Sequence, residues 1–150
     1  MFRLLIYILS LLLAYVSLAE ATPVKIELHG LQVIETKTNG SAWDAGFGTM
    51  LLPDLVVSIY QGERLIWATN KVSNRFEISR ILTSPTLQLD HTLPVRIEVI
   101  DKDLQADDLI ERFTLKLEDL SSKQFQKLSL TGKSVIKLNL LIKHTPSQTP

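Results

Sequence analysis

The stretch that decides the fold is Pro94-Val-Arg-Ile-Glu-Val-Ile-Asp-Lys-Asp103, followed by Leu-Gln-Ala-Asp-Asp-Leu-Ile110. Its first part, up to Ile100, is rich in β-branched residues and predicts a strand. Four carboxylates then fall within eight residues. Two unit charges about 4 Å apart repel by roughly 4 kcal/mol at an effective dielectric near 20, so such crowding calls for neutralisation. A calcium ion with oxygen ligands would provide it, and a solvated acidic turn is the alternative.

The first 21 residues have the pattern of a secretory signal peptide. Arg3 precedes an apolar run from Leu4 to Leu18, and Ala19-Glu20-Ala21 resembles a cleavage site. The run falls short of the roughly 20 apolar residues of a bilayer span, and an uncleaved anchor is the alternative. We therefore expect a periplasmic or secreted protein, with a domain over residues 22–143 and a disordered, Pro-rich tail over residues 144–150.

The composition excludes some classes of partner and scaffold. The chain of 150 residues carries 16 acidic and 16 basic side chains, so no general basic field is available to attract nucleic acid. It has no cysteine, so an exported domain of this kind depends on its hydrophobic core, with or without a metal, and not on disulfides. We expect a monomer.

The rest of the chain is punctuated by turns and reads as nearly all β. A strand is predicted from Val24 through Ile34, with a bulge or bend at Gly30. A long loop over residues 36–53 follows, and long loops in compact domains are usually functional or disordered. Further strands are predicted over residues 54–60, 64–72, 75–79, 86–89, 94–100, 112–117 and 135–142, and a short helical turn over residues 118–125.

Seven or eight short strands in about 120 residues predict an antiparallel β-sandwich. In the last strand, alternation places Ile136, Leu138, Leu140 and Ile142 on one face. In the third, Leu65, Trp67 and Thr69 share a face. A sandwich carries its loops at its two ends, so loops that are distant in sequence can meet there.

Three segments together resemble the C2 domain, an eight-stranded calcium- and phospholipid-binding β-sandwich. They are Leu52-Pro-Asp-Leu-Val-Val57 at the start of a strand, Val95-Arg-Ile-Glu-Val-Ile-Asp-Lys-Asp103, and Asp107-Asp-Leu-Ile110. With the strand spacing, the likeness covers about residues 24–143. The sequence departs from the family at Glu111, where a glycine is common, and at Leu55-Val56, where Pro-Tyr is common.

The resemblance implies a calcium site between two loops at one end of the sandwich. By matching position, the implied ligands are Asp44, Asp54, Asp101, Asp103 and Asp108, with Asp107 as a competing choice for the last. Asp101 and Asp103 are two apart in an extended segment, so both can point to the same side. Calcium takes six to eight oxygens, and an open loop site of this kind should bind with a Kd on the order of 10⁻⁴ to 10⁻³ M.

No pattern in the chain argues for catalysis. His29, His91 and His144 lack metal-ligand spacing, and neither a Gly-x-Ser-x-Gly elbow nor a thiol nucleophile is present. No histidine or lysine is expected to be positioned by the acidic loops, and Lys102 should be solvated. The resemblance implies a non-enzymatic module that binds an anionic phospholipid surface or a protein partner in the presence of calcium. A calcium-independent structural adaptor with a degenerate site is the alternative.

Overall fold

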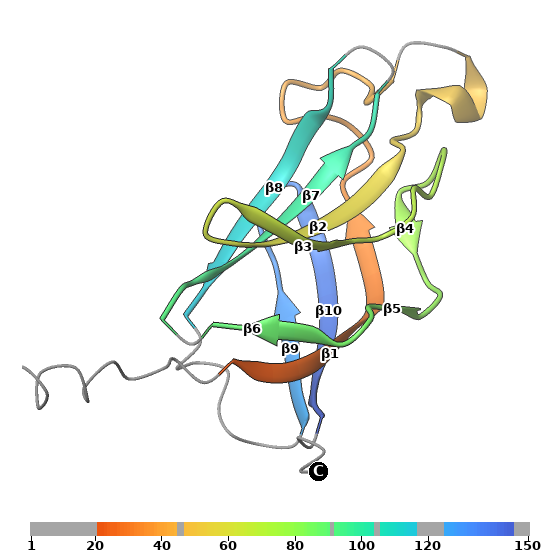
Figure 1. The fold of residues 1–150 in the computed structure, drawn as a ribbon. Helices are drawn as coiled ribbons and strands as arrows, with labels where there is room; N and C mark the ends of the chain where they lie inside the picture. Colours follow the sequence, from red (N-terminus) through yellow and green to blue (C-terminus); the bar gives the residue numbers. More distant parts are fainter. Residues whose placement is uncertain (1–20, 45–46, 91, 104–105, 117–124, 146–150) are drawn as a thin grey trace, which may run out of the picture.

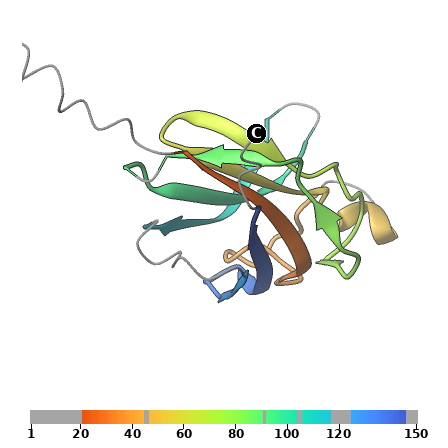
Figure 2. The same ribbon diagram turned by 60° about the horizontal axis from the view of Figure 1, so that its bottom comes forward.

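The computed structural model of the protein describes residues 21–44, 47–90, 92–103, 106–116 and 125–145. These residues form two antiparallel sheets packed face to face (Figure 1). Viewed with the lower end brought forward, the sheets form separate layers of one sandwich (Figure 2). The expected all-β sandwich is thereby confirmed. The expected signal peptide lies outside the described residues except for Ala21. Of the expected disordered tail only His144 and Thr145 are described, and His144 is the last residue of a strand.

The larger sheet is built around the long first strand. β1 (Thr22–Val33) pairs with β10 (Val135–His144), and β10 pairs with β9 (Phe125–Leu130). The other edge of β1 is covered by three short strands in succession, β4 (Glu77–Ile78), β5 (Leu82–Thr83) and β6 (Leu87–Leu89). Taken as one broken strand, these three bring the total to eight, whereas the predicted ranges count two of them separately and lack β9.

The smaller sheet has the order β3-β2-β7-β8. Its strands are β2 (Leu55–Gln61), β3 (Arg64–Ala68), β7 (Val95–Asp101) and β8 (Asp108–Leu115). One 3-10 turn, η1 (Gly48–Leu51), lies in the connection from β1 to β2. The β1–β2 and β7–β8 connections both lie at the upper end of the molecule in Figure 1. No helix among the described residues is long and apolar enough to cross a membrane.

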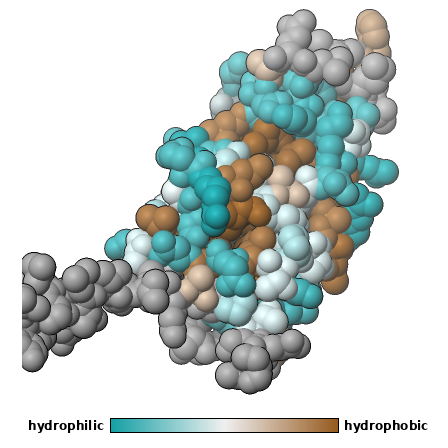
Figure 3. All heavy atoms as spheres, viewed as in Figure 1, coloured by the Kyte–Doolittle hydropathy of each residue, from teal (hydrophilic) through white to brown (hydrophobic). Residues whose placement is uncertain are grey.

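The core lies between the inner faces of the sheets. Alternate residues of β2 and β7 point inward, so Leu55, Val57 and Ile59 face the same layer as Ile97 and Val99, each at most 1% exposed. Burying a side chain of this size stabilises the fold by about 1.5–3 kcal/mol. Figure 3, drawn from the side of Figure 1, shows hydrophilic side chains gathered at the upper end and hydrophobic ones over the strands below.

Two β-bulges decide which residues reach the core. The register of β1 against β10 shifts between Leu28 and Gly30, which confirms the predicted irregularity at Gly30. A second shift lies between Gln32 and Val33. It turns Val135 into the core at 0% exposure and leaves Ile136 49% exposed, so the prediction that Ile136 shares a face with Leu138 is wrong.

The structure corrects three further expectations. β9 is a strand that the sequence analysis did not assign, and of the helical turn predicted over residues 118–125 only Phe125 is described, where it begins β9. β8 begins at Asp108, four residues before the predicted start, so the acidic loop is short. A register shift between Ile59 and Tyr60 also separates Leu65, 51% exposed, from Trp67, which packs against the core.

Candidate metal centre

Asp101 is the last residue of β7 and is held between two neighbouring strands. Its cross-strand partners are Leu55 of β2 and Asp108 of β8. In this position the side chain is 0% exposed. Its Oδ1 accepts a hydrogen bond from the backbone N–H of Asp54 at 2.7 Å, but Oδ2 has no hydrogen-bond partner among the described residues. A buried carboxylate oxygen without a donor is costly unless a cation or water meets it.

Backbone hydrogen bonds fasten the two acidic segments together. Besides the bond from Asp54 N–H to Asp101, the N–H of Lys102 donates to the carbonyl of Asp54 at 2.9 Å. The residues that begin β2 and end β7 therefore lie side by side, as the predicted site requires. They are also fixed by strand pairing, so this half of the site exists before any ligand binds.

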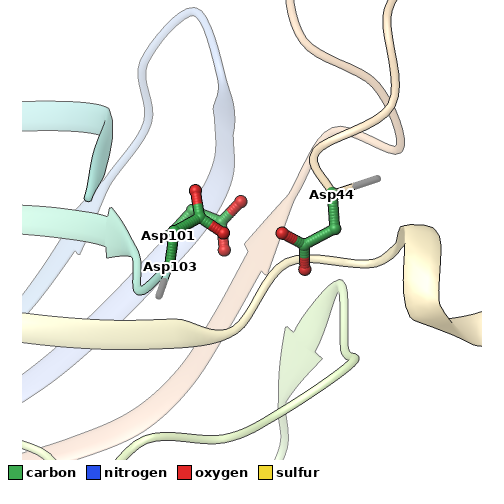
Figure 4. A group of neighbouring side chains, drawn as sticks. All are labelled: Asp44, Asp101 and Asp103. Carbon is green, nitrogen blue, oxygen red and sulfur yellow. The ribbon is translucent and has the colours of Figure 1, made fainter. Parts of the chain in front are cut away.

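Asp44 reaches the same place from the β1–β2 connection. The preceding residue, Trp43, is 6% exposed, and its Nε1 donates to the carbonyl of Ile34 at 2.9 Å, which anchors this part of the loop. Asp44 points toward Asp101 and Asp103 (Figure 4). One carboxylate oxygen from each of the three lies within 4.8 Å of the others. Three of the five predicted ligands therefore come together.

Burial and crowding raise the pKa of two of these carboxylates. Burial raises the pKa of Asp44 to about 7, assisted by its hydrogen bond with Asp103 and by the charges of Asp101, Asp103 and Asp54. Burial also raises the pKa of Asp101, and the charge of Asp103 adds to the effect. Groups that resist ionisation until a cation arrives are typical of metal sites and of other functional sites.

The other two predicted ligands lie beside this group but are paired with lysines. Lys37 donates to Oδ2 of Asp108, and Lys71 donates to Oδ2 of Asp54 at 2.5 Å. Burial alone would raise the pKa of Asp54, but bonds from Lys71, the Asn74 amide and Ser73 outweigh it and lower that pKa. The bond to Asp108 raises the pKa of Lys37. The expectation that no lysine is positioned by the acidic loops is therefore wrong.

Asp107, the competing choice for the last ligand, is paired within its own loop. Its Oδ2 accepts from Nζ of Lys102 at 2.6 Å, and both side chains are exposed by more than a third. Lys102 is thus solvated, as expected, but it is also paired. Asp108, in contrast, stands directly across from Asp101 in the β7–β8 register.

The donor set fits a hard divalent cation. Asp44, Asp101 and Asp103 supply carboxylate oxygens from two loops, and the orphaned Oδ2 of Asp101 needs a positive partner. Calcium prefers such oxygens in flexible geometry, and Asp54 and Asp108 could add more if their lysines moved. No other group of three or more metal-ligating side chains occurs in the described part of the chain.

Comparisons with known proteins place this geometry in a known fold. No protein-family model matches the sequence. The curated proteins give no match either. Solved structures do match: one holds the two C2 domains of extended-synaptotagmin 2 (TM-score 0.61, 14% identity, 83% of this chain and 42% of that chain). A calcium-bound structure of the same two domains has a TM-score of 0.58 at 14% identity over 83% of this chain and 46% of that one.

A third similar structure is a single C2 domain of a plant extended synaptotagmin 1. It has a TM-score of 0.55 at 14% identity, over 87% of this chain and 98% of that chain. The described residues therefore adopt a C2-like β-sandwich fold. The chain spans less than half of the two-domain structures that it matches, so at this identity the likeness concerns the fold alone.

Proposed function

We propose that the protein is a calcium-dependent binding module that engages an anionic membrane surface or a protein partner outside the cytoplasm. One observation carries the proposal: Asp101 is fully buried beside the carboxylates of Asp44 and Asp103, and its Oδ2 has no hydrogen-bond donor in the described chain. A calcium ion would satisfy that oxygen and cancel the repulsion. The proposed ligands are Asp44, Asp101 and Asp103, joined by Asp54 and Asp108.

A calorimetric calcium titration of the purified protein tests this proposal. We expect a Kd on the order of 10⁻⁴ to 10⁻³ M, and calcium at a hundred times that Kd should add about 2.7 kcal/mol of stability, a rise of several degrees in Tm. Asp103→Asn should weaken binding at least tenfold and leave the metal-free Tm unchanged or slightly higher. Asp107→Asn, in the same loop, is the matched control and should bind like the wild type.

The membrane part of the proposal is supported by Phe47. This ring is 92% exposed and lies in the same connection as Asp44, beside η1. An exposed aromatic ring in the connection that carries Asp44 could enter the interface while calcium bridges anionic headgroups. We expect calcium-dependent sedimentation with vesicles containing phosphatidylserine and not with neutral phosphatidylcholine, and Phe47→Ala should weaken it. Calcium binding without vesicle binding would instead favour a protein partner.

The alternative function, a calcium-independent structural adaptor, also has an observation in its favour. Lys37 and Lys71 already neutralise two of the five carboxylates without a metal. A Tm that is the same in calcium and in chelator would support the adaptor and contradict the calcium module.

Export is a separate proposal. The signal-like segment over residues 1–21 would direct the domain over residues 22–143 to the periplasm or the exterior. Fractionation of expressing cells and N-terminal sequencing of the product test it. A mature terminus near Thr22 in the exported fraction is expected, and an intact Met1 in the cytoplasmic fraction would contradict it.

A further inference from the structure

Lys37 and Lys71 reach the acidic end of the sandwich from separate loops. Backbone hydrogen bonds hold the chain at or next to each of them. Lys37 begins a tight turn in which its N–H donates to the carbonyl of Ser41 and its carbonyl accepts from the N–H of Gly40, each at 2.8 Å. Lys71 lies in the connection after β3, one residue before Val72, which exchanges backbone hydrogen bonds with Leu55 at 2.9 Å. The backbone at or next to each lysine is therefore held, and the ammonium group is tethered there by a flexible side chain.

The ammonium group of Lys37 lies among ring and carboxylate groups. It donates to Oδ2 of Asp108 and lies 5.8 Å from the centroid of the Trp43 ring, and its side chain is only 29% exposed. The neighbour of Trp43 is Asp44, and the cross-strand partner of Asp108 is Asp101. A cation at Lys37 therefore stands at the border of the group formed by Asp44, Asp101 and Asp103.

Lys71 completes the hydrogen bonding of the Asp54 carboxylate. Oδ2 of Asp54 accepts from Nζ of Lys71 at 2.5 Å, and Oδ1 accepts from the N–H of Asn74 at 2.9 Å. The Asp54 side chain is only 17% exposed. A metal ion bound to Oδ2 of Asp54 would lie close to the Lys71 ammonium group and repel it, and the flexible lysine side chain is the partner that can leave.

We infer that Lys37 and Lys71 are tethered competitors of the metal ion, which set the affinity of the acidic site by holding Asp108 and Asp54 until a divalent cation displaces them. The inference rests on the proposed calcium function. A tethered ammonium group competes at a high effective concentration, and it also repels an approaching cation. A monovalent ion offers no more charge than the lysine it would replace, so the two lysines also select for divalent ions.

The test is a calorimetric calcium titration of the whole chain carrying Lys37→Met, Lys71→Met or both. We expect the double variant to bind calcium at least tenfold more tightly than the wild type, and each single variant to fall between them. Lys102→Met is the matched control, since Lys102 also pairs with a loop carboxylate but with Asp107, outside the group, and its affinity should stay within twofold. Lys37→Arg with Lys71→Arg keeps both charges and should bind like the wild type.

A metal-free melt gives an independent readout. If the lysines neutralise the acidic end, the double Met variant should melt at a lower temperature than the wild type or Lys102→Met, and calcium should restore the loss. Should the double variant not fold without calcium, the single variants provide the comparison.

The outcomes separate this inference from the proposed function. Binding by the wild type with no tightening in any Met variant overturns the inference and leaves the calcium function in place. No binding by the wild type, with binding by the double variant, overturns the proposed function and also the displacement of the lysines by a divalent cation, because the lysines then exclude the metal. Absence of binding in every variant overturns both.

Discussion

Two carboxylates of β7, Glu98 and Asp101, are both nearly buried, yet their surroundings differ completely. Glu98, 8% exposed, lies on the outer face of the smaller sheet between two arginines. Its Oε1 is 2.9 Å from Nε of Arg112 and 3.3 Å from Nε of Arg96. Asp101, three residues on and 0% exposed, has one backbone donor and two neighbouring carboxylates in Asp44 and Asp103.

The difference shows which of the two buried carboxylates is stabilised by side chains of the protein itself. Glu98 is neutralised by guanidinium groups, and Arg96 is itself steadied by the Tyr60 ring, 4.6 Å from its Cζ. Burial of such a charge is tolerated because opposite charges surround it. At Asp101 the nearest cations, Lys37 and Lys71, are bound to other carboxylates. The outer face of the sheet thus pairs its buried carboxylate with two guanidinium groups, whereas the buried Asp101 is surrounded by carboxylates and its Oδ2 has no hydrogen-bond donor in the described chain.

The largest expected effect is the response of the metal-free protein to pH. The pKa of Asp44 is raised to about 7 and that of Asp101 is raised, so between about pH 4 and pH 7 the folded state holds more protons than the unfolded state. Stability that is present below pH 4 is therefore lost as pH rises toward 7. Each tenfold change in a protonation equilibrium is worth about 1.4 kcal/mol.

Thermal melts of the metal-free protein from pH 4.5 to 8 measure this loss. Calcium binds the ionised form, so saturating calcium should flatten or reverse the slope, and Asp44→Asn should reduce it. The pKa of Asp54 is lowered, so its contribution to stability is lost as pH falls, but only below about pH 4. A metal-free Tm that rises steadily from pH 4.5 to 7 would show that ionisation of Asp44 and Asp101 does not destabilise the fold.

The next effect contrasts the two carboxylates directly. Glu98→Gln should cost about 1–3 kcal/mol, because it leaves two arginines without their shared anion. Asp101→Asn should leave the metal-free stability unchanged or higher, because the amide oxygen can still accept from Asp54 N–H while the repulsion disappears. Urea denaturation in chelator measures both. Equal losses of stability in the two variants would show that the surroundings of Glu98 and Asp101 do not differ in the way described.

The smallest effect concerns a third carboxylate, Glu111, whose oxygen is satisfied by backbone. Its Oε2 accepts from the N–H of Ser134 at 3.0 Å, and a Cβ added at Gly132 would lie 2.3 Å from that oxygen. Gly132→Ala should displace Glu111 and cost about 1 kcal/mol. In Glu111→Ala the same glycine substitution should cost less, and equal costs in both backgrounds would show that the contact is not the cause.

The sequence predicted the strands where apolar residues alternate with polar ones, as in the first part of β1, and where β-branched residues gather, as in β7. It failed for β9. Gln126, Leu128 and Leu130 lie on the more buried side of this strand, and the glutamine weakens the apolar pattern. It also failed for Ile136, because this residue is the extra one in β10 at the register shift between Gln32 and Val33 of β1. Such shifts arise from pairing between distant segments, and local periodicity carries no record of them.

The candidate site also contains residues that the sequence predicted and residues that it did not. The resemblance to the C2 domain, carried by Asp101 and Asp103 after a strand and by Asp54 just before β2, predicted that these residues meet. Lys37 and Lys71 were not predicted, since their partners lie 71 and 17 residues away, and the pairs form only when the loops close at one end of the sandwich. Glu111, a departure from the family pattern, is explained by its bond to Ser134.

The interrupted covering of β1 has a consequence for solubility. An unbroken outer strand would offer a row of open amide and carbonyl groups on which a second molecule could build a continuous ribbon. Here the outermost row is cut into pieces of two or three residues, with Arg80 and Pro85 in the breaks. Fibril growth along that border is therefore disfavoured, so a ribbon between copies would have to form on the outer edge of β9, β3 or β8.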